Sequence, residues 1–508
     1  MSRLNDLKGK PLYLHITGMD NAFEAGHLIR LFHDRDPITR SGDGGEKDGL
    51  HICLDAVESE GTFTATASIH CNKAKIGYGI LSFTTAKVSA ASDLFLQSRK
   101  LCAGTALYRA LAEAFGTELP WGSLTGVRPV KLASCCLDDG MAQREILDIL
   151  GERTGMQIDK AALVLSIANR ERPFLTPPDR SVSLYAGIPF CSTRCLYCSF
   201  TSYPEKLHGH LIPAYLDALA KEVRFVGSWL SGTGRTLSSV YIGGGTPTSL
   251  SAGMLKTLLD LLEKELPMHA AREYTVEAGR PDTLDGEKLH LIKSAGATRI
   301  SINPQSMRAE TLRIIGRGHT PEQVEEVFHL AREFGFDNIN MDLIAGLPRE
   351  TPDHFRATLA RVALMRPDSL TVHTMAVKRA SRLHETIREG TAEPSASDSR
   401  VMEMIADAAA HAAKYGLHPY YLYRQKNILA NLENTGYARS GCECRYNIET
   451  MSERQTIIAV GSGGITKVSQ GGKQIERTFN VRELNHYISR IDEMIERKRE
   501  LLSRHMPG

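Results

Sequence analysis

Between residues 181 and 374 the chain alternates short apolar runs with longer amphipathic stretches. The runs are rich in β-branched residues and span 181–188, 238–244, 273–278, 298–303, 338–344 and 369–374. Segments with apolar residues at helical spacing follow five of them, at 214–230, 252–266, 285–296, 321–335 and 352–365. Strands that alternate with helices predict an α/β fold with a parallel sheet. Six units favour a partial or closed barrel, although the strand count alone does not exclude an open doubly wound sheet.

The segments on either side of this core have different patterns. Residues 51–58 and 61–71 alternate apolar and polar side chains, and 100–115 and 142–155 have helical periodicity. These patterns predict an α+β accessory domain over residues 1–170, followed by a proline-containing linker that leads into the core at 181–390. Residues 391–508 predict a helix-rich C-terminal domain that ends in a helix over 483–505.

Composition and charge exclude several classes of function. The chain has 508 residues, of which 61 are basic and 59 acidic, so the formal net charge is +2. This balance gives no reason to expect nucleic acid as a partner. The chain has no apolar run long enough to span a membrane and no apolar signal-peptide core at its start. The ten cysteines form no extracellular disulfide framework, and we expect a reducing cytoplasm.

Three of the cysteines carry the strongest chemical signal. Cys191, Cys195 and Cys198 have the spacing C-x3-C-x2-C directly after the first predicted strand. Cysteine thiolates hold iron–sulfur clusters, and a cubane with three protein ligands keeps one iron open for a substrate or cofactor. Structural zinc is the main alternative, but zinc sites need four ligands, and Cys442 and Cys444, spaced C-x-C, make a poor second pair.

The surrounding sequence has a family resemblance. The segment LYAGIPFCSTRCLYCSFTSYP, residues 184–204, resembles the cluster loop of the radical S-adenosylmethionine (SAM) enzymes. Within that superfamily it is most similar to the oxygen-independent coproporphyrinogen III oxidases, especially the HemZ branch, and the similarity continues to about residue 467. The resemblance implies a (β/α)6 partial barrel, a [4Fe–4S] cluster on the three cysteines, and cleavage of SAM to methionine and a 5′-deoxyadenosyl radical.

Polar and glycine residues at the ends of the predicted strands are candidates for binding SAM. Glycines at 243–245 would let backbone N–H groups approach a ligand, although such a run is as often a tight turn. Acidic groups can accept hydrogen bonds from an ammonium or ribose, and an arginine can clamp a carboxylate. Each residue alone could equally be a helix cap, an ion pair or a core amide. The resemblance assigns SAM binding to Tyr185, Tyr197, Gly244, Gly245, Thr246, Glu277, Gln305, Arg317, Asp342 and Ala376.

The same resemblance implies a substrate and a reaction. It implies oxidative decarboxylation of two propionates of coproporphyrinogen III to vinyl groups, which gives protoporphyrinogen IX and consumes two SAM molecules. A flavodoxin- or ferredoxin-like protein would supply the electron. Lys378, Arg379 and Arg382, which follow the sixth strand, are candidate cations for the propionates, with a solvated basic loop as the alternative.

Two departures keep a second function open. Established decarboxylases carry a further cysteine where this chain has Phe200, and the heme-trafficking relatives called HemW have an aromatic residue there. Those relatives also carry a histidine where this chain has Tyr446, between Cys444 and Asn447. Tyrosine can ligate ferric heme, so a non-catalytic heme-binding or heme-transfer protein on the same scaffold remains the alternative.

Overall fold

The computed structural model describes residues 7, 10–19, 22–33, 38–40, 49–84, 98–125, 128–176, 180–378, 381–389, 397–425, 428–471 and 474–506. The chain forms two compact units. The first contains Met1–Arg170 and Leu422–Glu433, and the second contains Glu171–Tyr421 and Asn434–Gly508. The domain boundaries drawn from the sequence at residues 170 and 390 remain a prediction.

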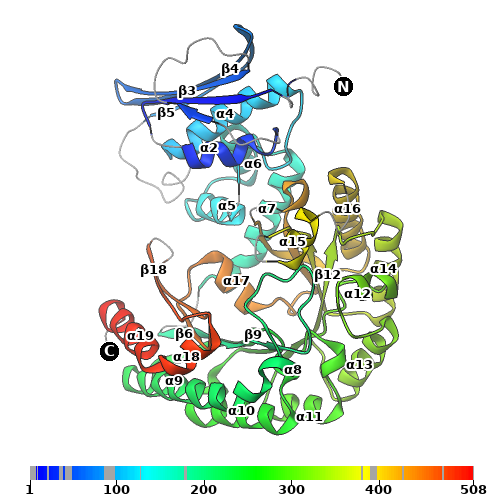
Figure 1. Ribbon diagram of the computed structural model, residues 1–508. Coiled ribbons are helices and arrows are strands. Elements are labelled where there is room, and N and C mark those ends of the chain that lie inside the picture. Colours follow the sequence, from blue (N-terminus) through cyan, green and yellow to red (C-terminus); the bar gives the residue numbers. More distant parts are fainter. Residues whose placement is uncertain are drawn as a thin grey trace. The chain divides into compact units, whose positions relative to one another are not determined.

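The second unit is built on six neighbouring parallel strands. They are β6 (Ser181–Ile188), β9 (Thr236–Gly244), β10 (Glu273–Glu277), β11 (Arg299–Ser301), β12 (Ile339–Ala345) and β13 (Ser369–Thr374), and each pairs with the next. Figure 1 shows the connecting helices on the outer side of these strands: α9 (Ile212–Thr233), α10 (Ala252–Glu265), α11 (Gly286–Ser294), α13 (Pro321–Glu333) and α14 (Pro352–Met365). The order β6-β9-β10-β11-β12-β13 confirms the predicted (β/α)6 partial barrel.

Local sequence signals set where these helices begin. The Thr320 hydroxyl accepts a hydrogen bond from the Gln323 backbone N–H, and the Gln323 side chain bonds back to Thr320, which completes a capping box at α13. Pro321 occupies the first helical turn, where its missing N–H costs nothing. Thr351 and Pro352 repeat this arrangement at α14. Satisfied backbone donors at these ends stabilise each helix by about 1 kcal/mol.

Four of the barrel strands each bury all of their residues except one. Along β6, β10, β12 and β13 every residue is buried except Tyr185, Glu277, Asp342 and His373, respectively. Parallel strands covered on both faces are normally apolar throughout. The four half-buried polar side chains therefore mark the inside of the barrel as a candidate site.

The C-terminal segment combines helices with strands. Its helices are α16 (Asp398–Lys414), α17 (Arg445–Ser452), α18 (Leu484–Ser489) and α19 (Ile491–His505). Five strands that the sequence analysis did not predict join the barrel sheet as well. β14 (His418–Tyr423) and β15 (Asn434–Ala438) extend it beyond β13, and β16 (Ile457–Val460), β17 (Ile465–Gln470) and β18 (Gln474–Phe479) extend it beyond β6. Runs of four to six residues are too short for periodicity to separate strand from helix.

The first unit confirms the expected α+β accessory fold. Its sheet has the order β2-β1-β3-β4-β5, and α4 packs against β4 and β5. The side chain of any other residue at Gly79 would overlap the Ala106 carbonyl of α4, so glycine permits this close approach. The bounds are β1 (Leu12–Thr17), α2 (Ala22–Ile29), β2 (Ile38–Arg40), β3 (Leu50–Ser59), β4 (Thr62–Cys71), β5 (Ala74–Thr84), α4 (Arg99–Phe115), α5 (Pro129–Asp138), α6 (Gln143–Thr154) and α7 (Ile158–Glu171). Among the helices described here, none has the length and apolar character needed to cross a bilayer.

Candidate functional site

The three cluster cysteines lie in a loop at the carboxyl end of the first barrel strand. After β6 the chain forms β7 (Phe190–Cys191), which pairs with β8 (Tyr203–Pro204) and closes the loop at its base. The carboxyl ends of barrel strands are where barrel enzymes place their catalytic loops. Cys195 is buried, whereas Cys191 and Cys198 are half-buried.

Backbone hydrogen bonds fix the middle of this loop from two sides. The Leu196 N–H donates to the Ile315 carbonyl at 3.0 Å, and the Leu383 N–H donates to the Leu196 carbonyl at 2.9 Å. Ile315 follows the fourth strand and Leu383 follows the sixth. The barrel therefore holds the cysteine loop by segments from separate strand ends rather than leaving it free.

The burial of the cysteine thiols is better suited to binding a metal cluster than to forming free thiolates. Burial raises the pKa of Cys191 to about 11, although a hydrogen bond with Thr246, 3.6 Å from the sulfur, opposes the shift. Burial also raises the pKa of Cys198. Without a cation both side chains are therefore neutral thiols at pH 7, and a bound metal favours the thiolates. In the described part of the chain no three His, Cys, Asp or Glu side chains form a preassembled metal-ligand group, so the cluster assignment rests on the donor chemistry and the family.

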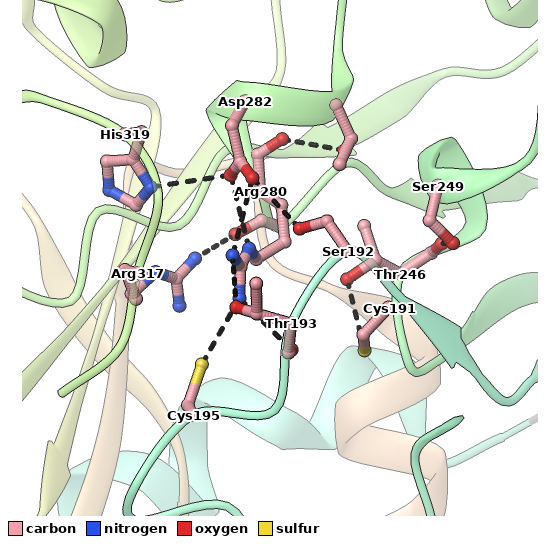
Figure 2. Close-up of polar contacts among 12 residues, drawn as sticks. Cys191, Ser192, Thr193, Cys195, Thr246, Ser249, Arg280, Asp282, Arg317 and His319 are labelled. Carbon is pink, nitrogen blue, oxygen red and sulfur yellow. Dashed lines mark hydrogen bonds and ion pairs between the residues drawn. The ribbon is translucent and has the colours of Figure 1, made fainter. Parts of the chain in front are cut away.

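An arginine that the sequence analysis missed contacts the loop directly. Arg280, in the segment after β10, donates hydrogen bonds to the Cys195 sulfur at 3.3 Å and to the Thr193 hydroxyl at 2.8 Å (Figure 2). Its partner Asp282 accepts a hydrogen bond from Ser192 at 2.9 Å. The signal was present in the sequence as RPDT immediately beyond the Glu277 strand end, but it has no motif of its own.

Arg317 also contacts the cysteine loop, through Tyr197. Its guanidinium donates to the Tyr197 hydroxyl at 3.1 Å and to the backbone carbonyls of Asn303, at 2.8 Å, and Gly279. Burial lowers the pKa of Arg317, but the neighbouring Tyr197, Cys195 and Asp282 together outweigh that effect and raise it. These contacts already occupy both terminal nitrogens of Arg317. Bidentate binding of a carboxylate by Arg317 remains a prediction.

The glycine run bridges the cysteine loop and the barrel interior. A side chain at Gly243 would lie 2.8 Å from the Glu277 carboxyl carbon, and one at Gly245 would lie 2.5 Å from the Phe190 carbonyl oxygen. Gly244 has a φ of 107°, a conformation that other residues rarely adopt. Close approach favours glycine at 243 and 245 and the backbone conformation favours it at 244, and the run connects Glu277 to the start of the cysteine loop.

Glu277 is a buried carboxyl group with a strongly perturbed pKa on the inner wall of the barrel. Burial raises its pKa to about 7, and a hydrogen bond from the Tyr241 hydroxyl opposes the shift. Tyr241 lies one strand away on β9, at the same level as Tyr185 of β6. Because perturbed carboxyls cluster at functional sites, Glu277 is a strong candidate for ligand binding.

Asp342 forms a second acidic position on the same inner wall. Its carboxylate lies 3.6 Å from His373 and accepts a hydrogen bond from Asn340 at 2.7 Å. Burial raises the pKa of Asp342, but the bonds from His373 and Asn340 outweigh it and lower the pKa. The proximity of Asp342 raises the pKa of Glu277, so the structure brings these two predicted SAM residues together.

The remaining predicted SAM residues lie at or near the ends of the strands. Gln305 is buried with a φ of 68°, and its backbone bonds to both Asp342 and Ile344. Holding a non-glycine residue in this region costs about 1 kcal/mol or more, and such strain concentrates at functional sites. Thr246 is buried beside Cys191, and Ala376 is half-buried just beyond β13.

Helix α17 carries Tyr446 into the barrel. Glu273, the first residue of β10, accepts hydrogen bonds from the backbone N–H groups of Arg445 and Tyr446, at 2.7 and 3.2 Å, and from the Cys444 thiol at 3.3 Å. The Tyr446 ring then stacks on Tyr241. Cys444 is fully buried and its thiol is bonded to Glu273, which makes it a poor candidate for a heme ligand.

The candidate propionate cations have different positions. Lys378 is half-buried, and burial lowers its pKa while the nearby Cys198 raises it, which places Lys378 beside the cysteine loop. Arg382 is exposed at the start of α15 (Arg382–Arg388). Arg379 lies outside the described residues. Phe200 is 68 % exposed in the cysteine loop.

Comparison with known proteins identifies the relatives of this chain. The sequence model of the Radical SAM superfamily matches residues 185–362. The oxygen-independent coproporphyrinogen-III oxidase-like protein HemZ of Bacillus subtilis is 40 % identical over 388 residues, which cover 75 % of this chain and 77 % of that protein. The heme chaperone HemW of the same organism is 32 % identical over 315 residues, 61 % of this chain and 76 % of HemW.

Two further matches come from Escherichia coli. Its oxygen-independent coproporphyrinogen III oxidase is 35 % identical over 199 residues, 39 % of this chain and 43 % of that enzyme. The solved structure of coproporphyrinogen III oxidase HemN, described as a radical SAM enzyme, superposes with a TM-score of 0.51 and 26 % identity over 64 % of this chain and 72 % of HemN. Membership of this superfamily implies a 4Fe–4S cluster and SAM. The chain belongs to the radical SAM superfamily, in the HemZ branch of the oxygen-independent coproporphyrinogen III oxidase family.

Proposed function

We propose that this protein is a SAM-dependent coproporphyrinogen dehydrogenase. It would convert two propionate side chains of coproporphyrinogen III to vinyl groups and so produce protoporphyrinogen IX, with one SAM for each propionate. The observation that carries the proposal is the acidic inner wall of the barrel. Glu277 and Asp342 lie there together, and the glycine run connects Glu277 to the cysteine loop.

Each part of this wall suits one part of SAM. The three cysteines would hold the cluster, which with bound SAM supplies a 5′-deoxyadenosyl radical. Glu277 would accept hydrogen bonds from the SAM ammonium beside the glycine run, and Asp342 would accept them from ribose hydroxyls, because charge-assisted bonds of this kind are strong.

The net change at each propionate is small and balanced. The β-hydrogen atom would pass to the 5′-deoxyadenosyl radical to give 5′-deoxyadenosine, CO2 would leave, one electron would pass to a one-electron acceptor, and a vinyl group would remain. Lys378, half-buried beside the cysteine loop, would bind a propionate near the reacting position. A flavodoxin- or ferredoxin-like donor would reduce the cluster, and a reducing cytoplasm would keep the cysteines available as ligands.

A heme-binding function is the second candidate. It is favoured by the 32 % identity to a heme chaperone and by Phe200, which stands in the position of an additional cysteine. Against it, Cys444 is fully buried, and Tyr446, in the position of the chaperones' histidine, is stacked inside the barrel. Neither side chain is placed to meet a heme at the surface.

One experiment separates the two functions. The reconstituted protein is incubated without oxygen with SAM, a chemical reductant and coproporphyrinogen III, and the porphyrins are then separated after oxidation. We expect a mono-vinyl intermediate followed by protoporphyrin, with 5′-deoxyadenosine formed in step. Cleavage of SAM without any vinyl product, together with stoichiometric heme binding, would establish the chaperone function instead.

A further inference from the structure

The segment after β10 places a permanent positive charge on one of the cluster cysteines. Arg280 is 3 % exposed, and it donates to the Cys195 sulfur at 3.3 Å (Figure 2). A guanidinium remains protonated throughout the accessible pH range. The positive charge of Arg280 therefore lies beside the Cys195 sulfur.

The chain builds this contact from local sequence. Pro281 restricts Arg280 to an extended backbone, with a φ of −126° and a ψ of 102°. The Arg280 carbonyl then accepts hydrogen bonds from the Thr283 N–H at 2.9 Å and from its hydroxyl at 2.8 Å. The turn that follows fixes the direction of the arginine side chain toward the cysteine loop.

The Asp282 carboxylate pairs with the Arg280 guanidinium and partly compensates its positive charge. Asp282 lies 3.2 Å from the Arg280 guanidinium, and it also accepts from Ser192 at 2.9 Å and lies 3.6 Å from His319. Burial raises the pKa of Asp282, but the contacts with His319 and Arg280 outweigh it and hold the pKa well below its usual range. Arg280 and Asp282 thus form a charge pair whose positive end points at Cys195.

We propose that Arg280 tunes the electron affinity of the cluster bound by this loop, and that Asp282 sets the strength of this effect. Hydrogen bonds to the sulfurs and the local net charge are the terms by which a protein sets an iron–sulfur potential. A positive charge favours the reduced cluster, which carries one more electron. Arg280 therefore acts on electron uptake through its hydrogen bond to the Cys195 sulfur, as a positioning residue.

Because Arg280 and Asp282 carry opposite charges, the proposal predicts opposite effects when each is neutralised. Arg280→Gln removes the positive charge and leaves Asp282 uncompensated, which should make the cluster harder to reduce. Asp282→Asn leaves Arg280 uncompensated, which should make the cluster easier to reduce. A purely structural role for the pair predicts shifts in the same direction in both variants, because both would loosen the same loop.

The test is a redox titration of the full-length, anaerobically reconstituted protein, followed by electron paramagnetic resonance of the reduced cluster. For Arg280→Gln we expect about a tenfold lower ratio of reduced to oxidised cluster at fixed solution potential, which is about 59 mV for a one-electron couple. Asp282→Asn should shift the ratio upward, and Arg280→Lys, which keeps the charge, should shift it less than Arg280→Gln. The titration contains neither SAM nor porphyrinogen, so its result is independent of the proposed substrate.

The control is Arg332→Gln, in the same compact unit. Arg332 pairs with Asp368 at 2.7 Å and donates to the Phe336 carbonyl, and these partners lie outside the cysteine loop. This variant should keep the wild-type potential. Equal potentials for wild type and Arg280→Gln, or shifts of one sign in Arg280→Gln and Asp282→Asn, would overturn the proposal. If Arg280→Gln takes up no cluster, Asp282→Asn decides: a higher potential supports the proposal and an unchanged one refutes it.

Discussion

Tyr446 stacks on Tyr241 inside the barrel, with ring centroids 4.5 Å apart and planes inclined by 24°. Tyr185 continues the stack at 6.0 Å from Tyr446. The Tyr241 hydroxyl donates a hydrogen bond to Glu277, a candidate SAM ligand on the next strand. Tyr446, from the C-terminal segment, therefore supports Glu277 through Tyr241. The position at which the heme-trafficking relatives carry a histidine is therefore, in this chain, part of the barrel wall.

The first prediction is that Tyr446→Ala weakens SAM binding without loss of the cluster. A stacked aromatic pair contributes about 0.5–1.5 kcal/mol beyond its buried area, which corresponds to a rise in Kd of roughly 2–10-fold if Tyr241 and Glu277 lose their support. Tyr446→Phe keeps the ring and is the matched control. Isothermal titration of the reconstituted proteins with SAM measures the difference, and equal affinities for Ala and Tyr would refute the supporting role.

The second prediction concerns the cluster ligands. Replacing Cys191, Cys195 or Cys198 by Ala should abolish the broad thiolate-to-iron absorption band and leave well under four irons per chain after reconstitution. Cys442→Ala is the control, since this side chain should hold no iron, and it should keep the full iron content. Loss of the band in that variant would mean that the C-x-C pair takes part in the cluster site.

Much of the barrel could be predicted from sequence because its signals are local. The apolar runs at 181–188 and 369–374 coincide with β6 and β13, and the helix expected at 352–365 coincides with α14. Caps and periodicity depend only on neighbours in the chain. The strands β14 to β18 were missed because each is too short to show a clear periodicity, and because β15 and β16 pair with the distant strands β13 and β6.

Some features of the candidate site could also be predicted from local sequence, and others could not. The cysteine spacing and the glycine run could be read from the sequence, and the structure brings them together where Gly245 approaches the Phe190 carbonyl. The contact of Arg280 with Cys195 could not, since it depends on how a turn after β10 meets a loop after β6. Tyr241 and His373 were missed because single polar residues in an apolar strand are uninformative until the inward face is known.

A third prediction follows from the raised pKa of Glu277, which is about 7 where an ordinary Glu has 4.5. If the ionised carboxylate accepts hydrogen bonds from SAM, affinity should be highest above pH 7 and should fall as the pH drops below it. Tyr241→Phe removes the hydrogen bond that lowers this pKa, so the midpoint should move to higher pH. Glu277→Gln should abolish the dependence, and a Glu277→Gln profile identical to wild type would show that another group titrates.

The last prediction tests how the C-terminal helix is attached. Lys498 of α19 and Glu222 of α9 are both fully buried and form an ion pair. Glu222 also accepts hydrogen bonds from the Gly461 N–H at 2.8 Å, Asn480 at 2.7 Å and the Tyr487 hydroxyl at 2.6 Å. Because removing one partner leaves the other charge buried and uncompensated, Lys498→Ala should destabilise the docked helix by about 3–5 kcal/mol.

Hydrogen exchange of the backbone amides at 491–505 measures this effect, since it reports the local opening of α19 even when the whole chain does not unfold in one step. Arg497→Ala is the matched control on the same helix. Arg497 is exposed and pairs with Glu493, one turn earlier on α19, so its loss should change the opening free energy by about 0.5 kcal/mol or less. Equal protection factors in the two variants would show that the buried pair does not hold α19 in place. Faster exchange confined to Lys498→Ala would show that α19 is held through its ion pair with α9, one of the outer helices of the barrel.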